Sequence, residues 1–174
     1  LSSQISSDFY SQNEFELAEF LKIPGNKLEL GRACIHPTHR NGTLKDLLWK
    51  GISEYIKCSH SDILFGCSSV MTTSPQVIFK LLDFFKSKNL HSAQYSIHTK
   101  EKYVMPFNEG QENHQNDNDN FLGFLPPLLK GYFLAGAKVY GSPAFDQDFM
   151  CTDFFTILFL KDLNASFQKR YMKN

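Results

Sequence analysis

The sequence predicts an α/β fold in which helices flank a mixed β-sheet. Two apolar runs of strand length, residues 27–35 and 62–70, are each followed by apolar residues at helical spacing. The order strand, helix, strand, helix predicts a parallel pair of strands joined by a crossover helix. Residues 1–174, of which 42% are hydrophobic, are enough for a single domain with its own core.

The first predicted strand carries two charged side chains on either side of a glycine. In residues 27–35, KLELGRACI, strict alternation places Glu29 and Arg32 on opposite faces. A β-bulge at Gly31 would turn both side chains toward one site, and we predict such a bulge. Glu29 and Arg32 would also suit a structural ion pair, and the sequence leaves that alternative open.

A tight turn follows this strand and leads into a helix. Arg40, Asn41 and Gly42 form the turn, and Thr43 with Asp46 three residues later has the pattern of a capping box. Free backbone N–H groups and the positive end of the helix dipole meet at such a helix start. We therefore expect Arg40, Asn41, Gly42 and Thr43 to bind a phosphate group.

The remaining elements follow from hydrophobic spacing and turn residues. The helix after the turn carries an apolar stripe made of Leu44, Leu47, Leu48, Ile52, Tyr55 and Ile56. Residues 62–70 are typical of a strand covered on both faces, and Ser74-Pro75 begins a further helix. We also expect a short helix over 14–20, a short strand over 94–97, a mobile loop over 108–120, a helix that Gly136 ends, and strands over 138–140 and 152–160.

Composition excludes several kinds of function. Lys+Arg and Asp+Glu are equal at 18 each, so no basic excess predicts binding to nucleic acid. The four cysteines lack CxxC spacing and the six histidines, His36 and His39 among them, lack metal-ligand spacing, so we expect no metal site. Such cysteine usage favours a cytoplasmic setting, and no apolar run is long enough to span a membrane. Because the chain begins with Leu, we expect it to be part of a longer protein.

Five blocks of sequence resemble one family in their order and spacing. The blocks are ELGRACIHPTHRNG, LLWKGISEYI, LFGCSSV, LPPLLKGYFLAGAKVYGSPAFDQDF and CTDFF, and the likeness covers about residues 9–160. They are similar to the ornithine N-acyltransferases that make lyso-ornithine lipid, members of the GNAT superfamily that also carry the name hemolysin. The ELGR segment also resembles the acyl-homoserine-lactone synthases, GNAT-like enzymes that use acyl carrier protein.

The resemblance implies that a (3-hydroxy)acyl group moves from acyl carrier protein to the α-amine of ornithine in a GNAT-like fold. It implies that Glu29 is the base for the attacking amine and that Arg32 binds the carboxylate of the acceptor. The Arg40-Asn41-Gly42 turn would receive the phosphate of the acyl-phosphopantetheine arm. Because this turn is shorter than the coenzyme A loop of GNAT enzymes, the resemblance favours the carrier protein over acyl-CoA. No permanently bound cofactor is expected.

Five further residues are candidates for substrate binding. Ser68 and Ser69 end the second strand, where open α/β sheets bind ligands, although they also suit capping of the next segment. By the resemblance, Lys130 and Tyr132 would serve the leaving thiolate or the carrier phosphate; otherwise they are a solvated side chain and a core ring. Asp153 would lie near the acceptor or cap a turn.

Two other functions stay open at this stage. One is an acyl-homoserine-lactone or long-chain N-acyl-amino-acid synthase, and the other is an inert GNAT-like domain that binds a lipid, a membrane surface or a partner. The family has an N-terminal portion, with the first strand and helices of the fold, that this sequence lacks. We therefore expect an uncovered sheet edge that a second copy or another chain completes. Peripheral contact with the inner membrane would suit a lipid product.

Overall fold

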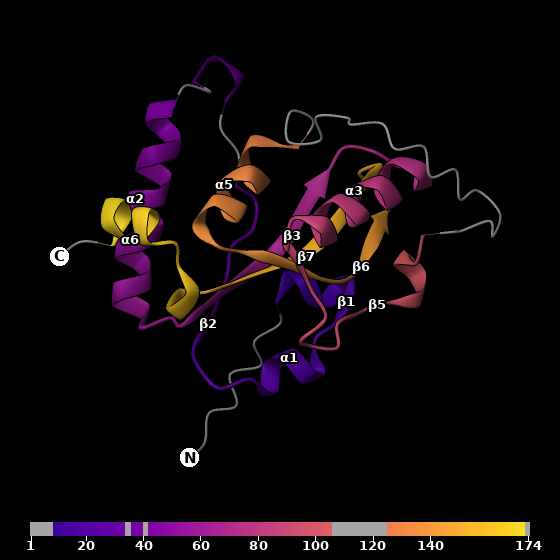
Figure 1. The fold of residues 1–174 in the computed structure, drawn as a ribbon, viewed down its shortest axis with the longest axis horizontal. Helices are drawn as coiled ribbons and strands as arrows, with labels where there is room; N and C mark the ends of the chain where they lie inside the picture. Colours follow the sequence, from indigo (N-terminus) through magenta and orange to yellow (C-terminus); the bar gives the residue numbers. More distant parts are fainter. Residues whose placement is uncertain (1–8, 34–35, 40–41, 106–124, 173–174) are drawn as a thin grey trace.

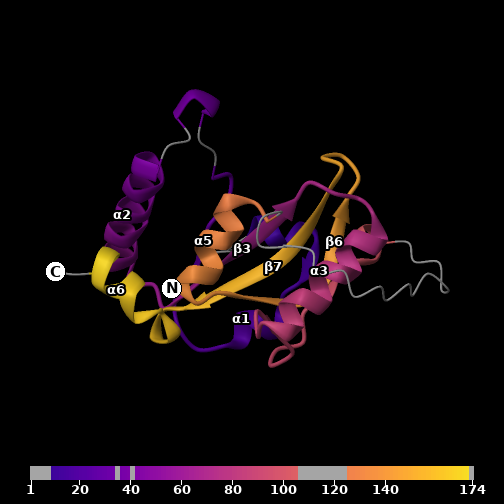
Figure 2. The same cartoon turned by 45° about the horizontal axis from the view of Figure 1, so that its top comes forward.

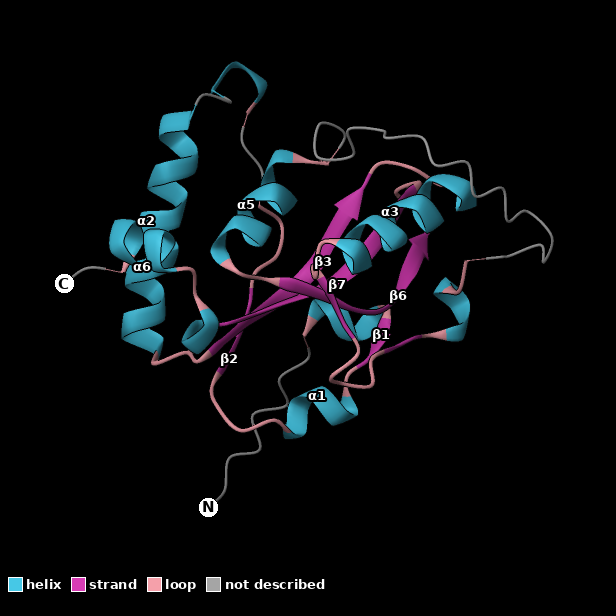
Figure 3. Ribbon diagram, in the orientation of Figure 1, coloured by secondary structure: helices cyan, strands magenta, loops and turns pink. Residues whose placement is uncertain are grey.

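Five strands form the central sheet of this computed structural model, which describes residues 9–33, 36–39, 42–105 and 125–172. From one edge to the other they are β2 (Lys27–Glu29), β3 (Ile63–Val70), β7 (Cys151–Phe159), β6 (Lys138–Asp146) and β4 (His91–Ser92). β2 and β3 are parallel, as predicted, and so are β4 and β6, whereas β7 is antiparallel to both of its neighbours. The sheet is therefore mixed (Figures 1 and 3).

Helices cover one face of this sheet, and the start of the described chain covers the other. The first group comprises α2 (Gly42–Ser59), α3 (Pro75–Ser87), α5 (Pro127–Ala135) and α6 (Ala165–Tyr171). The second comprises the 3₁₀ turn η1 (Tyr10–Asn13), β1 (Phe15–Glu16), which pairs with β5 (His98–Thr99), and α1 (Ala18–Lys22). Figure 2 shows α2 and α6 side by side at one end of the molecule and α3 toward the other. Among the described helices, none combines the length and the apolar character needed to cross a bilayer.

β7 explains why both layers stay attached to the sheet. Its side chains alternate between faces, as strand geometry requires. Phe155 and Ile157 join the cluster under β1 and α1, whereas Phe154 packs with α3 and α5, and Leu158 packs with α2 and α6. Nearly every residue of this strand is buried, which is typical of a strand covered on both sides.

Two glycines fix local geometry near the parallel strands. A Cβ on Gly66 would lie 2.3 Å from the carbonyl oxygen of Leu30, so only glycine permits the chain after β2 to approach β3 this closely. Gly136 ends α5 in the left-handed region with φ 110°, as the sequence predicted. The helix that begins with Ser74 and Pro75 is also confirmed, and the Ser74 side chain accepts a hydrogen bond from the backbone N–H of Val77.

Four predicted boundaries are wrong. The first strand ends at Glu29 instead of continuing to residue 35, because the backbone takes a left-handed conformation at Arg32. Residues 14–20 divide into β1 and α1, since Phe15 pairs with Thr99 across the chain. The strands near 94–97 lie on either side of that range, and β6 runs on to Asp146 through a register shift. The loop predicted over 108–120 lies outside the described residues.

Candidate active site

An open groove of about 840 Å³ lies between α2 and the chain that follows β2. Its walls are mostly apolar and consist of Leu28, Glu29, Leu30, Gly31, Ala33, His36, His39, Leu44, Leu47, Leu48, Gly51, Ile52, Tyr55 and Tyr132. The apolar stripe predicted for α2 therefore serves two purposes. Ile56 is buried in the core, whereas Leu47, Leu48 and Tyr55 stay 54%, 43% and 60% exposed along the groove. The groove has the volume and the mostly apolar lining expected of a site for an apolar ligand.

A second, smaller cavity lies beyond the end of β2, beside the part of β3 that has no β2 partner. Pairing between the strands ends at Glu29 and Phe65, apart from one further bond from the Leu30 N–H to the Phe65 carbonyl. Leu30 and Tyr132 line both the groove and this cavity. Ser68 lines the cavity but not the groove. The Ser68 Oγ atom is buried without a hydrogen-bond partner among the described residues. The two spaces thus meet at the end of the parallel pair.

Glu29 lies beside this junction with its carboxylate fully engaged. The backbone N–H groups of Tyr10 and Ser11 each donate to it at 2.7 Å, and the Ser11 hydroxyl donates at 2.5 Å. These three donors from η1 hold the carboxylate in one position. Glu29 is half-buried and lines the groove, as a base serving a ligand in that groove would.

Arg32 does not lie where the sequence predicted. No ion pair joins its guanidinium to Glu29 in the part of the chain described, so the structural ion pair is absent there. The bulge predicted at Gly31 is also wrong, because β2 has already ended and Arg32 itself takes φ 53°. Its exposed guanidinium lies 5.9 Å from the centre of the Tyr10 ring, where a cation–π contact forms.

The predicted phosphate turn is only partly described. Arg40 and Asn41 lie outside the described residues, and only the backbone of Gly42 and Thr43 is described. α2 begins at Gly42, so a helix N-terminus lies where the sequence predicted one. Asp46 does not act as a cap, because its carboxylate accepts hydrogen bonds of 2.5 Å from Arg170 and from the Tyr171 hydroxyl.

Tyr132 and Lys130 share a helix but differ in position. Tyr132 is in edge-to-face contact with Trp49 at 5.8 Å and lines both spaces, whereas Lys130 lines neither. Burial raises the pKa of the Tyr132 hydroxyl to about 12, so the group stays a neutral hydrogen-bond donor at physiological pH. The structure therefore keeps Tyr132 next to the junction of the two spaces and separates Lys130 from it.

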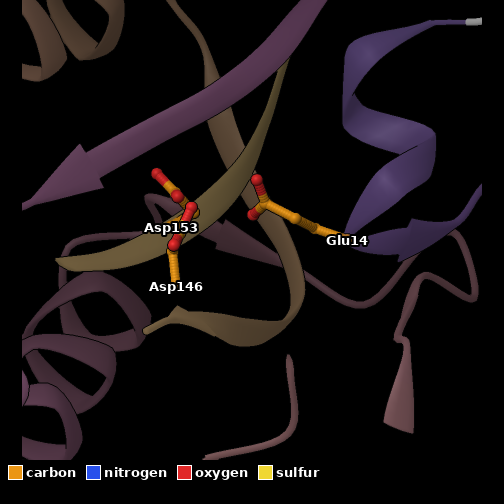
Figure 4. Close-up of side chains that lie close together, drawn as sticks. All are labelled: Glu14, Asp146 and Asp153. Carbon is orange, nitrogen blue, oxygen red and sulfur yellow. The ribbon is translucent and has the colours of Figure 1, made fainter. Parts of the chain in front are cut away.

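Ser69 and Asp153 form a second polar site on the opposite face of the sheet from Ser68. The Ser69 hydroxyl donates to Asp153 at 2.5 Å across the β3–β7 pair. Asp153 also lies close to Glu14 and Asp146, and carboxylate oxygens of all three lie within 4.8 Å of one another. We call Glu14, Asp146 and Asp153 the acidic cluster. Figure 4 shows Glu14 reaching toward the two aspartates from a separate part of the chain.

The acidic cluster is buried and electrostatically unfavourable in its fully ionised form. Glu14, Asp146 and Asp153 are only 1%, 6% and 4% exposed. Burial, reinforced by the charges of Asp153 and Asp146, raises the pKa of Glu14 to about 8. Burial also raises the pKa of Asp153. At neutral pH the empty cluster therefore retains a proton that an exposed glutamate would lose.

The sequence singled out only Asp153 in this cluster. Glu14 was assigned to a helix, and Asp146 to a loop that in fact forms the end of β6 and its turn. Asp146 Oδ1 accepts hydrogen bonds from the backbone N–H groups of Asp148 and Phe149, which shapes that turn. Asp146 and Asp153 lie seven residues apart on the two strands of one hairpin, and this spacing could have indicated that they are close. No residue near Glu14 in the sequence indicated its role.

A chain of polar side chains connects Glu29 with the acidic cluster. The Ser11 hydroxyl donates to Glu29, and the Cys67 thiol lies 3.4 Å from the Ser11 oxygen. Burial raises the pKa of the Cys67 thiol, and the nearby Glu14 carboxyl raises it further, so the thiol stays protonated. Glu29, at the groove, and Glu14, under η1, are thus close neighbours through Ser11 and Cys67.

The family described as acetyltransferase (GNAT) domain matches residues 2–50 of this chain, and the mixed sheet flanked by helices agrees with the predicted GNAT-like fold. That match contains Glu14, Glu29 and the phosphate turn. The sequence is also similar to the L-ornithine N(alpha)-acyltransferase of Rhizobium meliloti (strain 1021), with 29% identity over 165 residues that cover 94% of this chain and 55% of that protein. The enzyme of the same name from Brucella abortus (strain 2308) is 28% identical over 165 residues, covering 94% of this chain and 58% of that protein.

These similarities confirm the resemblance that the sequence blocks indicated. The L-ornithine N(alpha)-acyltransferase of Agrobacterium fabrum (strain C58 / ATCC 33970) is a further relative, 28% identical over 163 residues and 88% of this chain. The chain spans little more than half the length of the curated relatives it matches. No solved structure gives a significant match.

Proposed function

We propose that this chain is part of an N-acyltransferase that moves a long (3-hydroxy)acyl group from acyl carrier protein to the α-amine of ornithine, giving lyso-ornithine lipid. The similarity to three L-ornithine N(alpha)-acyltransferases over most of the chain supports the acceptor and the reaction class. The observation that carries the proposal within the structure is the apolar groove whose lining includes Glu29.

The groove suits the acyl chain of the donor. Its exposed Leu47, Leu48 and Tyr55 offer apolar surface to a hydrocarbon chain, and burying that surface favours binding by about 25 cal/mol per Å². α2 begins at the end of the groove near Gly42, and a phosphate of the phosphopantetheine arm would bind at that helix N-terminus. The thioester would then lie along the groove, beside Glu29.

Glu29 would take the proton that the attacking amine must lose, directly or through a water molecule. For that it must exchange one of its three present donors for the amine, because Tyr10 and Ser11 now occupy the carboxylate. Arg32, exposed at the same end of β2, would attract the carboxylate of the acceptor amino acid. Tyr132 would donate a hydrogen bond near the thioester without ionising.

The test uses the full-length protein with an acyl-acyl carrier protein thioester and isotope-labelled ornithine, and mass spectrometry detects the N-acyl product. Glu29→Gln should lower kcat by about 100-fold or more, the usual loss when a general base is removed. Glu54→Gln is the matched control, since Glu54 is exposed on α2 and only pairs with Lys57. Formation of no N-acyl product from any amino acid would reject the proposal.

Two further comparisons separate the finer parts of the proposal. Replacing the carrier protein thioester with the acyl-CoA should lower kcat/KM if the carrier protein is the true donor. Presenting ornithine together with S-adenosylmethionine and neutral amino acids would show whether the protein is instead an acyl-homoserine-lactone or general N-acyl-amino-acid synthase. A Glu29→Gln variant that still restores lipid synthesis in a deficient strain would favour the inert binding domain.

A further inference from the structure

We propose that the acidic cluster of Glu14, Asp146 and Asp153 binds the terminal ammonium group of the diamino acid acceptor. The inference rests on the proposed function and adds to it a site for one end of the acceptor. It explains why three carboxylates that are far apart in sequence converge inside the protein. The other end of the acceptor, with its reacting α-amine, would lie toward Glu29.

The first argument is the missing positive charge. Three buried carboxylates lie together, yet no described Lys, Arg or His side chain forms an ion pair with any of them. Buried carboxylates in proteins are normally paired with a cation or neutralised by protons, because burial of an uncompensated charge costs several kcal/mol. The cluster reduces its charge by keeping a proton on Glu14, and a bound ammonium group would take the place of that proton.

The second argument is an unfilled acceptor. The Oε2 atom of Glu14 is inaccessible to water and has no hydrogen-bond partner among the described residues. Glu14 itself is 1% exposed, and Figure 4 shows its carboxylate directed at Asp146 and Asp153. An unsatisfied buried acceptor costs about 1–3 kcal/mol, so a donor placed there would be stabilising.

The third argument is spacing. An ammonium group has three N–H donors and no acceptor. Three tetrahedrally directed bonds of about 2.8 Å hold their acceptor oxygens about 4.6 Å apart. One oxygen from each carboxylate of the acidic cluster lies within 4.8 Å of the others, so a single ammonium nitrogen could reach all three.

A calcium ion suits the cluster less well than an ammonium group does. Calcium takes about six to eight oxygen ligands. Asp146 Oδ1 already accepts two backbone N–H groups, and Asp153 Oδ1 already accepts the Ser69 hydroxyl. The three carboxylates can each accept one of the three N–H donors of an ammonium group, whereas water molecules would have to complete a calcium shell.

The location of the cluster connects it with the groove. Asp153 lies beside Ser69 at the carboxyl end of β3, the end of a parallel strand at which open α/β sheets bind their ligands. Two hydrogen bonds join Glu29 to Cys67 through Ser11, and a further hydrogen bond joins Cys67 to Glu14 of the cluster. A diamino acid carries one amine at each end, so it can satisfy Glu29 with one and the cluster with the other. The cluster is closed in this structure, so the ligand enters when Glu14 and η1 move away from the β6–β7 hairpin.

The experiment compares ornithine with norvaline, which has the same carbon chain without the terminal amine. With the full-length protein, kcat/KM for ornithine should exceed that for norvaline by at least tenfold. Asp153→Asn and Asp146→Asn should each raise KM for ornithine at least tenfold and lower the preference for ornithine over norvaline at least tenfold, with the KM for the acyl donor unchanged. Asp148→Asn is the matched control, because Asp148 is exposed in the same hairpin and should behave as wild type.

Several results would overturn the inference. Equal use of ornithine and norvaline by the wild-type protein would do so while leaving the proposed function intact, and so would an aspartate variant that slows both acceptors equally. Thermal unfolding of each variant checks folding, and Glu14→Gln replaces any aspartate variant that fails to fold. If no amino acid is acylated, the proposed function fails, and calorimetric titration of ornithine and norvaline decides the inference: equal or absent binding rejects it.

A metal ion is the competing occupant of the acidic cluster, and a separate experiment tests for it. Terbium luminescence with the wild-type protein, competed by Ca²⁺ and lost in Asp146→Asn, would assign the cluster to a metal and overturn the ammonium site. Absence of a terbium signal together with calorimetric preference for ornithine over norvaline supports the inference.

Discussion

Replacing Glu14 by glutamine should change how the stability of the protein depends on pH. The pKa of Glu14 is about 8 in the folded protein, against 4.5 for the unperturbed group, and burial is the main cause. Between pH 4.5 and pH 8 the unfolded chain loses this proton while the folded chain keeps it. The free energy of unfolding therefore falls as pH rises through this window, by about 1.4 kcal/mol per pH unit from this group alone.

Glu14→Gln has nearly the same shape and carries no charge at any pH. The variant and the wild-type protein should be similar in stability near pH 4.5, and the variant should be more stable by about 3 to 5 kcal/mol near pH 8. Urea denaturation at a series of pH values measures the two curves. Glu54→Gln, an exposed carboxylate, should follow the wild-type curve. Parallel curves for Glu14→Gln and wild type would refute the argument that burial holds a proton on Glu14.

Three further predictions concern glycine, tryptophan and tyrosine residues at or near the groove. Gly66→Ala should destabilise the protein by about 1–3 kcal/mol in urea denaturation, because the added Cβ would clash with the Leu30 carbonyl oxygen. Gly51→Ala should stabilise α2 by about 0.5–1 kcal/mol, because the added Cβ has no atom within 4 Å and alanine favours a helix. Equal effects of the two substitutions would contradict this. Trp49→Ala should cost about 3–5 kcal/mol by the same method, since it empties a buried aromatic cluster, and Trp49→Phe should cost less. An ultraviolet titration should show Tyr132 ionising only near pH 12, and Tyr132→Phe should remove that late step alone; its persistence would assign the step to another tyrosine.

The sequence predicted those elements whose signals are local. The strand over 62–70, the helix beginning with Ser74 and Pro75, and the helix end at Gly136 all depend on neighbouring residues, and the structure confirms them. The length of the first strand could not be predicted, because it depends on how closely Leu30 approaches Gly66 on another strand.

The candidate site was predictable to the same extent. The resemblance singled out Glu29, which lines the groove, but its three hydrogen bonds come from a segment about eighteen residues earlier. Glu14 was missed because its chemistry depends on Asp146 and Asp153, which lie more than a hundred residues away. The alternation of side chains along one strand cannot predict a contact between such distant residues.

The bond between the last helix and α2 has a practical consequence. No residue of α6 lines the groove, yet Arg170 and Tyr171 hold Asp46 one turn into the helix that forms its wall. Phe167 and Tyr171 also support Trp49 from behind. Shortening the protein from its carboxyl terminus past residue 165 would therefore loosen the α2 wall of the groove, and a fusion partner is better attached after α6 through a spacer.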